Sequence, residues 1–121
     1  MKQKSLILAV DRNRRNLELL AEFLGKEGYR VLAAASMEEF DQAISESKDV
    51  GLVLLDIAGF ERGIWDRCEQ LREQGIPFLV LSPRQSVAIH QESLAHGAAG
   101  VLVKPLLIRQ LLGVIQSLLE R

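Results

Sequence analysis

Short apolar runs alternate with amphipathic segments along the chain, and this alternation restricts the fold more than any other feature of the sequence. The apolar runs predict five strands, which we place at residues 5–10, 29–34, 50–55, 77–81 and 100–103. Three of these runs are almost continuous in apolar residues, which is typical of strands covered on both faces. A strand followed by a helix, repeated five times, favours right-handed crossovers onto one parallel sheet.

Between the apolar runs, hydrophobic residues recur at the spacing of one helix face. The five patterns are Leu17, Leu20, Ala21 and Leu24; Phe40, Ala43 and Ile44; Ile64, Cys68 and Leu71; Val87, Gln91 and Leu94; and Ile108, Leu111, Leu112, Ile115 and Leu119. We therefore expect a three-layer, doubly wound (βα)5 sandwich with the flavodoxin-like strand order 2-1-3-4-5, as one domain over residues 1–121.

Composition excludes several classes of protein. The 15 basic and 16 acidic residues leave a net charge of −1, so no overall charge attracts nucleic acid or an anionic membrane. No apolar run approaches the roughly 20 residues of a membrane-spanning helix. The single cysteine, Cys68, has no partner for an internal disulfide and suits a reducing cytosol. We expect a cytoplasmic protein without direct nucleic-acid or membrane contacts.

Polar residues follow four of the predicted strands, at the edge where a doubly wound sheet binds ligands. They are Asp11 with Arg12, Asp56, Ser82, and Lys104 followed by Pro105. Taken singly, Asp56 is an ordinary strand-end carboxylate and Ser82 a turn hydroxyl before Pro83. Taken together they predict phosphoryl chemistry, because a carboxylate can attack phosphorus while a hydroxyl and an ammonium hold its oxygens. The proline after Lys104 indicates a tight turn in which a cis peptide is an option.

The chain resembles the receiver domain of two-component response regulators in the stretches ILAVDRNRRNLELL, GLVLLDI, PFLVLS and HGAAGVLVKPL. The resemblance covers essentially the whole chain. It implies that Asp56 accepts a phosphoryl group from a histidine kinase or phosphotransfer protein, and that Ser82 and Lys104 bind the phosphoryl oxygens. It also implies a Mg²⁺ site formed by Asp11, Asp56 and the backbone carbonyl of Ala58.

Arg12 is the most important departure from the pattern of that family, because it stands where a second acidic residue usually binds Mg²⁺. With the usual acid, the formal charge of the pocket formed with Asp11, Asp56 and Lys104 is −2, and with Arg12 it is zero. One unit charge a few ångströms away is worth about 3 to 4 kcal/mol at an effective dielectric near 20. We therefore expect weakened Mg²⁺ binding.

The direction of the Arg12 side chain is left open by the sequence. One alternative is that Arg12 folds onto Asp56 as a charge-assisted pair and mimics the charge of the metal. The other is that it points into solvent with Arg14 and Arg15 and leaves only a weaker metal site. These three arginines form the one local basic patch, interpreted as a solvated helix start, with anion binding as the alternative.

Three further departures concern the switch and the loops. Val101 stands at the switch position, where the family often has Tyr or Phe, and valine cannot report a change by moving an aromatic ring. Pro83 follows Ser82 and removes an N–H that would otherwise bind a phosphoryl oxygen. The loop 58–63 lacks a proline often found there and has a displaced glycine, so its shape is not predicted.

The remaining conspicuous side chains have structural interpretations. Phe60 and Trp65 flank the start of the third helix and are expected to pack. Cys68 lies on the apolar face of that helix and is expected in the core. His90 and His96 lack the spacing and the acidic partners of a metal site.

Three classes of function follow. The first is a receiver, not an enzyme, in which phosphorylation changes the surface of residues 84–119 and so alters the binding of a downstream target or effector domain, or homodimerisation through that face. The second is a pseudo-receiver that binds proteins independently of phosphorylation. The third is an enzyme, an aspartate-dependent phosphohydrolase or a nucleotide-binding protein. It is disfavoured because Ala58 stands where such hydrolases carry a second aspartate, and because no glycine-rich nucleotide loop is present.

Overall fold

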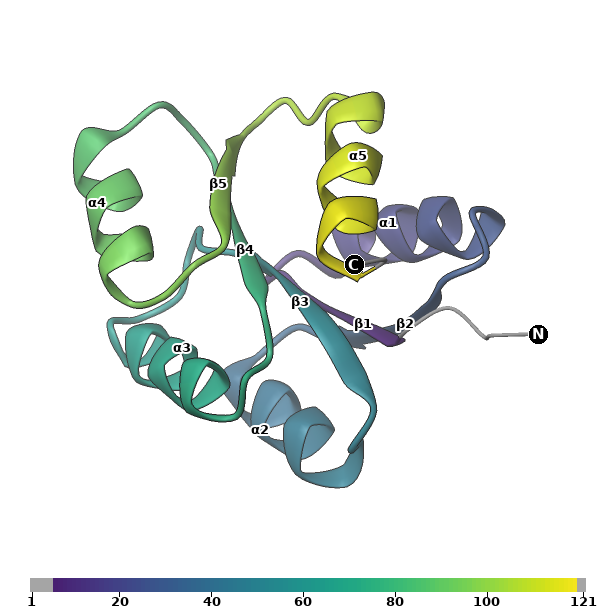
Figure 1. The fold of residues 1–121 in the computed structure, drawn as a ribbon, viewed down its shortest axis with the longest axis horizontal. Helices are drawn as coiled ribbons and strands as arrows, with labels where there is room; N and C mark the ends of the chain where they lie inside the picture. The colour runs from purple at the N-terminus through teal and green to yellow at the C-terminus, as the bar shows by residue number, and fades with distance from the viewer. Residues whose placement is uncertain (1–5, 120–121) are drawn as a thin grey trace.

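The computed structural model describes residues 6–119 and shows the predicted alternation of strands and helices (Figure 1). The elements are β1 (Leu6–Val10), α1 (Arg14–Lys26), β2 (Arg30–Ala34), α2 (Met37–Glu46), β3 (Val50–Asp56), α3 (Gly63–Glu73), β4 (Phe78–Ser82), α4 (Val87–Ala95), β5 (Gly100–Val103) and α5 (Ile108–Leu119). All strand pairs are parallel and the order is β2-β1-β3-β4-β5. The predicted fold class and strand order are confirmed.

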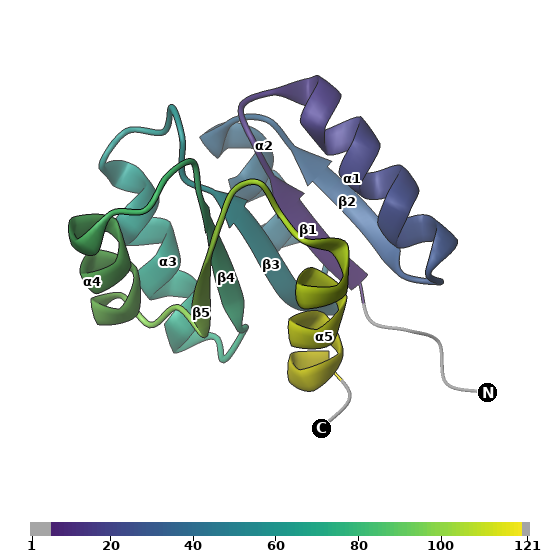
Figure 2. The ribbon, with the colours of Figure 1, turned by 90° about the horizontal axis from the view of Figure 1, so that it is seen from above.

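The sheet is covered on both faces, and the two views show three layers (Figures 1 and 2). Side chains alternate along β1, so that Ile7 packs with Leu24 of α1 and with Leu111 and Ile115 of α5. The other face receives residues of α2, α3 and α4, among them Phe40, Ile64, Trp65, Cys68 and Ile89. Both clusters consist of buried apolar side chains, whose removal from water is the main stabilising contribution to such a fold.

Local sequence determines where the helices begin. Asn13, Ser36 and Ser86 precede α1, α2 and α4, and each side chain accepts a hydrogen bond from the backbone N–H three residues later. Gly97 follows α4 with a φ of 99°, a conformation that is strained for residues with a Cβ atom. These signals position the loops at both ends of the sheet.

The strand boundaries differ from the predicted ones by one residue in several places. β3 and β4 extend to Asp56 and Ser82, because Asp56 pairs with Leu81 and Ser82 with Val103. Tyr29 precedes β2, since its N–H is bonded to the carbonyl of Leu24 at the end of α1. β4 begins after Pro77, which has no N–H to donate. The predicted start at residue 5 lies outside the described residues.

The prediction of which face of α4 packs against the core is wrong. Val87 and Leu94 are 71% and 46% exposed, and Gln91 is also exposed. Instead, Ile89 packs against the core and Ser93 is buried, with its hydroxyl donating to the carbonyl of Ile89 at 2.6 Å. A serine that bonds back to its own helix needs no other partner inside the protein, so the weakly apolar face of α4 is the one that turns inward.

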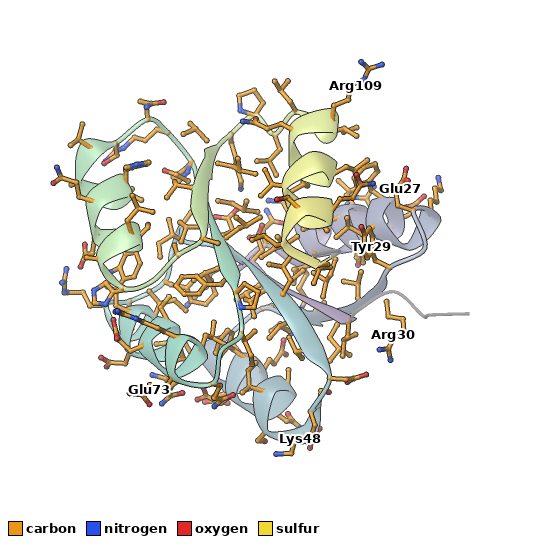
Figure 3. All side chains as sticks on the ribbon, in the orientation of Figure 1. Glu27, Tyr29, Arg30, Lys48, Glu73 and Arg109 are labelled. Atoms are coloured by element: carbon orange, nitrogen blue, oxygen red, sulfur yellow. The ribbon has the colours of Figure 1, made fainter. Side chains whose placement is uncertain are left out.

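The first residue of the predicted α5 stripe, Ile108, is also exposed, whereas Leu111 and Ile115 are buried. The charged side chains of Lys48, Glu73 and Arg109 are exposed and point outward (Figure 3). Within residues 6–119, no helix is long and apolar enough to cross a membrane.

Candidate functional site

Backbone hydrogen bonds align the residues that follow the strands at the carboxyl edge of the sheet. The N–H groups of Asp11, Ile57 and Lys104 donate to carbonyls of β2, β4 and β4 respectively, at 3.1, 3.2 and 2.9 Å. A cavity of about 490 Å³ opens beside this edge, and its lining includes Asp11, Asp56 and Lys104. The structure therefore places three of the predicted site residues around one space.

Asp56 is the most buried acidic side chain of this site, and both of its oxygens have partners. Its Oδ1 accepts a hydrogen bond from the backbone N–H of Ala58 at 3.1 Å, and its Oδ2 is bonded to Nζ of Lys104. A buried carboxylate is costly unless it is paired in this way. The result is an anionic oxygen held at the cavity by a lysine that lies in the loop after β5.

Asp11 is half-buried and lies close enough to Asp56 for the two carboxylates to interact. Burial is the main cause that raises the pKa of Asp11, and the charge of Asp56 raises this pKa further. The backbone N–H of Asn13 donates to Asp11 Oδ1 at 2.8 Å and opposes the increase. Two neighbouring carboxylates form the acidic part of the site.

Ser82 is buried at the end of β4, and its hydroxyl is bonded within its own loop. Its Oγ donates to the carbonyl of Arg84 at 2.6 Å, across the turn made by Pro83. Ser82 is therefore a turn hydroxyl in this structure, which is the role expected of it when it is considered alone. For the hydroxyl to reach a ligand beside Asp56, the bond to Arg84 has to be broken.

Arg12 is exposed to solvent, as the second alternative expects, and the first alternative is wrong. Among the ion pairs of the described residues there is none between Arg12 and Asp56. The guanidinium lies 5.7 Å from the ring centroid of Phe60, a cation–π contact, and the Arg12 side chain covers Gly59. Arg12 therefore lies along the loop that follows β3, because the phenyl ring offers a surface on which the guanidinium can stack.

Arg14 and Arg15 lie at a solvated helix start, as expected, and each is paired with a carboxylate. Arg14 pairs with Glu39 at 2.6 Å, and Arg15 with Glu18 at 3.3 Å. Both arginines are strongly exposed, so these pairs contribute little stability. They do neutralise most of the positive charge at the start of α1.

The donor atoms of the site fit Mg²⁺ in type. The carboxylates of Asp11 and Asp56 and the carbonyl of Ala58 offer oxygen ligands, and Mg²⁺ is commonly held by one or two carboxylates with waters and phosphate. Within the described part of the chain, no group of three or more His, Cys, Asp or Glu side chains has a geometry suited to a metal ion.

The other predicted site positions lie in β5 and the loop after it. Val101 is half-buried, pairs with Val80 of β4 and packs on the face covered by α2, α3 and α4. The peptide between Lys104 and Pro105 is cis. Val101 and Pro105 thus flank the segment that carries Lys104 to Asp56.

His96 has two acidic neighbours, although among residues 6–119 no group of side chains forms a metal site. Its Nδ1 lies 2.9 Å from Oε2 of Glu69, and its Nε2 lies 4.0 Å from Oε1 of Glu92. The imidazole also stacks on Trp65, with ring centroids 5.1 Å apart. Trp65 and His96 are far apart in sequence, so no local pattern indicates this contact.

The packing expected of Trp65, Phe60 and Cys68 is confirmed. Trp65 and Cys68 are buried in the cluster below α3, and Phe60 packs against it. Burial raises the pKa of the Cys68 thiol to about 12, with a smaller contribution from Glu69. A thiol that remains protonated at neutral pH is a poor nucleophile.

A second, larger cavity of about 700 Å³ lies at the opposite end of the sheet, between α2 and α3. Its lining is mostly polar, and the ion pair between Arg67 and Asp41 borders it. None of the residues predicted for phosphoryl chemistry lies there, so its size does not make it the candidate site.

Comparisons with known proteins give a consistent result. The family model of the response regulator receiver domain matches residues 7–116. The response regulator MprA of Mycobacterium avium (strain 104) is 36% identical over 118 residues, which cover 95% of this chain and 51% of that protein. The chain thus spans about half the length of the curated relatives it matches.

Solved structures agree on the fold. A two-component response regulator from Clostridium difficile aligns with a TM-score of 0.88 at 24% identity, over 98% of both chains. A CheY-like response regulator receiver domain protein from Methanospirillum hungatei JF-1 aligns with a TM-score of 0.85 at 28% identity, over 97% of this chain and 94% of that one.

Proposed function

The chain belongs to the response regulator receiver domain family, and on that basis we propose that it switches by accepting a phosphoryl group on Asp56. Receiver domains act in two-component signalling and are generally not enzymes. The observation that supports Asp56 as the acceptor is its buried carboxylate, bonded to Lys104 at the edge of the cavity. A free acidic side chain at the surface would have neither feature.

The chemistry assigned to Asp56 is nucleophilic. A carboxylate oxygen attacks the phosphorus of a phosphohistidine or a small acyl phosphate, and the bond from phosphorus to the donor breaks. Lys104 then exchanges part of its interaction with the carboxylate for a phosphoryl oxygen. Ser82 provides a second donor after its hydroxyl leaves the carbonyl of Arg84.

Receiver domains typically bind Mg²⁺ for phosphorylation. In this chain Asp11, Asp56 and the Ala58 carbonyl would hold the ion, which offsets the charge on the phosphoryl oxygens when bound. Arg12 reduces the attraction of the site for a dication. We therefore assign weak Mg²⁺ binding to this receiver, with phosphorylation of Asp56 correspondingly slower.

Receiver domains interact with histidine kinases and with downstream effector domains. For this chain the proposed phosphodonor is a histidine kinase or a phosphotransfer protein in the cytoplasm. The proposed output surface is the 84–119 face, where Val87, Leu94 and Ile108 are exposed. Apolar side chains exposed in this way suit an effector domain or a second copy of the chain.

The test is intact-mass spectrometry after incubation with acetyl phosphate and Mg²⁺. The wild-type chain is expected to gain one phosphoryl group, and the Asp56→Asn variant none. Asp49→Asn is the matched control, because Asp49 is an exposed aspartate that pairs with Arg30 away from the cavity. It should gain the phosphoryl group as the wild type does.

Two results would count against this function. Uptake that persists in Asp56→Asn would place the acceptor elsewhere. No uptake in the wild type at any Mg²⁺ concentration, but uptake in Arg12→Asp, would show that the natural chain works without phosphorylation.

A further inference from the structure

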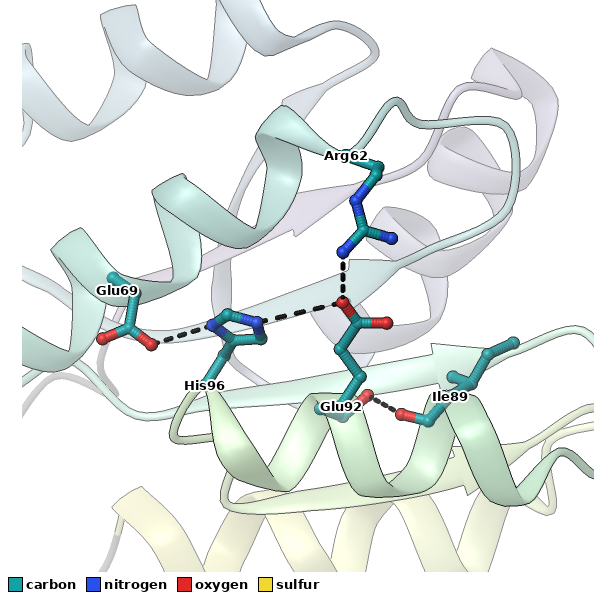
Figure 4. Close-up of polar contacts among 6 residues, drawn as sticks. Arg62, Glu69, Ile89, Glu92 and His96 are labelled. Carbon is teal, nitrogen blue, oxygen red and sulfur yellow. Dashed lines mark hydrogen bonds and ion pairs between the residues drawn. The ribbon is translucent and has the colours of Figure 1, made fainter.

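A single imidazole joins the end of α4 to the face of α3. His96 follows α4 directly, and its backbone N–H donates to the carbonyl of Glu92 at 3.1 Å. Its ring stacks on Trp65 of α3 with an angle of 14° between the planes. Figure 4 shows His96 between Glu69 of α3 and Glu92 of α4, one carboxylate facing each ring nitrogen. We call Trp65, Glu69, Glu92 and His96 the His96 cluster.

Charged groups of the neighbouring elements surround this cluster. On α3, Arg72 lies 3.9 Å from Glu69 and also covers Gly97. At the start of α3, Arg62 pairs with Glu92 at 2.9 Å. The acidic groups that face the imidazole are therefore Glu69 and Glu92, and each has an arginine as its second partner.

Few other contacts fix α4 to the protein. Ser93 is the one residue of α4 that is buried, and Ile89 packs only partly into the core. Val87 and Leu94 face outward. A helix with so little buried apolar surface depends on the contacts at its ends, and the His96 cluster is one of those at its carboxyl end, beside the bond from the N–H of Ala99 to the carbonyl of Phe78.

We propose that the His96 cluster is a pH-sensitive connection that fixes α4 to α3 when His96 is protonated. An imidazolium has an N–H on both ring nitrogens, so it keeps the hydrogen bond to Glu69, attracts the carboxylate of Glu92 from 4.0 Å and places its charge against the face of Trp65. A neutral imidazole has one N–H. The neutral ring keeps its hydrogen bond to one of the two carboxylates and presents a lone pair to the other. That second carboxylate then has only its arginine as a partner.

The consequence concerns the outer face of α4. Protonation of His96 fixes α4 through both carboxylates, and loss of the proton loosens its carboxyl end. The presentation of Val87 and Leu94 to a partner then depends on pH. This connection goes beyond the proposed phosphorylation and operates in the unphosphorylated chain.

The first test uses fluorescence, because Trp65 is the only tryptophan and the chain has two histidines. A protonated imidazole in contact with an indole quenches its emission. Emission of the whole 121-residue chain should fall as the pH is lowered from 8 to 5.5, and this fall should vanish in His96→Gln. His90→Gln, which removes the other histidine, an exposed one on α4, should behave as the wild type does. Glu69→Gln should reduce the quench at pH 6.

The second test measures the rate of amide hydrogen exchange in residues 87–99. At each pH, the rate in the wild type is divided by the rate in His96→Gln. The wild-type segment should exchange several-fold more slowly than the variant at pH 6, and the difference should shrink at pH 8. The same ratio for residues 50–56 of β3 should stay near one.

A ratio for 87–99 that does not change with pH would overturn the proposal, as would a quench that survives in His96→Gln. Asp56→Asn leaves these readouts unchanged, which keeps this result separate from that of the phosphorylation test.

Discussion

Lys104 and Asp56 form an ion pair in which the two charges are buried to very different extents. The Asp56 side chain is 2% exposed and that of Lys104 is 31% exposed. The carboxylate therefore depends on the lysine more than the lysine depends on the carboxylate, because water can still reach the ammonium. The partners of this pair are not equivalent for the stability of the fold.

This inequality predicts different costs for the two single substitutions. Lys104→Met should lower the free energy of unfolding at pH 7 by about 2 to 3 kcal/mol, less than the 3 to 5 kcal/mol of a fully buried pair. Asp56→Asn should cost less than about 1 kcal/mol, because water solvates the remaining ammonium. Urea unfolding measures both, with Lys48→Met at an exposed lysine as the control. Equal costs would contradict this account of the pair.

The raised pKa of Asp11 predicts a pH dependence with a definite sign. A folded-state pKa above the ordinary 3.8 means that the folded chain binds the proton more tightly. The stability from this group is therefore complete below pH 3.8 and is lost as pH rises through the raised value. Asp11→Asn, which keeps an oxygen for the N–H of Asn13, should unfold at a higher temperature than the wild type at pH 7.

That gain should shrink toward pH 4, in buffer containing a chelator so that no metal ion contributes. Thermal unfolding followed by circular dichroism at several pH values is the measurement. A gain of constant size at every pH would mean that burial of the Asp11 charge is not its cause.

Arg12→Asp should strengthen Mg²⁺ binding at least tenfold. Tenfold corresponds to about 1.4 kcal/mol, well within what reversing a nearby charge supplies. Isothermal titration calorimetry compares the dissociation constants. Arg15→Asp makes the same change of charge at a neighbouring exposed position that pairs with Glu18, and should leave Mg²⁺ binding nearly as it is. Equal strengthening by both would indicate a general effect of net charge.

Two isoleucines of α5 should respond differently to truncation. Ile115→Ala removes a fully buried side chain and should cost about 2 to 5 kcal/mol. Ile108→Ala removes an exposed side chain and should change stability by less than about 0.5 kcal/mol. Chemical denaturation of both variants tests this directly. A large cost at Ile108 would mean that it is covered by a second copy of the chain.

The Cys68 thiol should react with a disulfide reagent only after the protein opens. With a pKa of about 12, roughly one thiol in ten thousand is ionised at pH 8. Reaction with Ellman's reagent should be slow in buffer and fast in guanidinium chloride, at one thiol per chain. Fast reaction of the native protein would contradict the burial of this side chain.

The sequence predicted the layers and the strand order because buried parallel strands appear as apolar runs. The same rule misplaced the ends of β3 and β4, since Asp56 and Ser82 are polar and yet belong to the hydrogen-bonded ladder. The inner face of α4 was not predictable from hydrophobicity, because a serine that bonds to its own helix is buried there and two large apolar residues are not.

At the site, position along the strands was enough to bring Asp11, Asp56 and Lys104 to one cavity. The contact of Arg12 with the ring of Phe60 was not predictable, because that ring lies in a loop whose shape the sequence left open. The bond from Ser82 to Arg84 and the stack of His96 on Trp65 depend on how loops and helices close in space. Neither has a local sequence signal.

The row of backbone bonds at the carboxyl edge has a consequence for protein engineering. Asp11, Ile57 and Lys104 are each fixed by a carbonyl of a neighbouring strand, not by the helices. Helices α2 and α4 contribute no residue to the lining of the cavity, so their exchange for the helices of other regulators should leave the acidic pocket with the same dimensions. A chimera that carries a foreign α2 or α4 on this sheet would change its recognition surfaces and retain the same reactive centre.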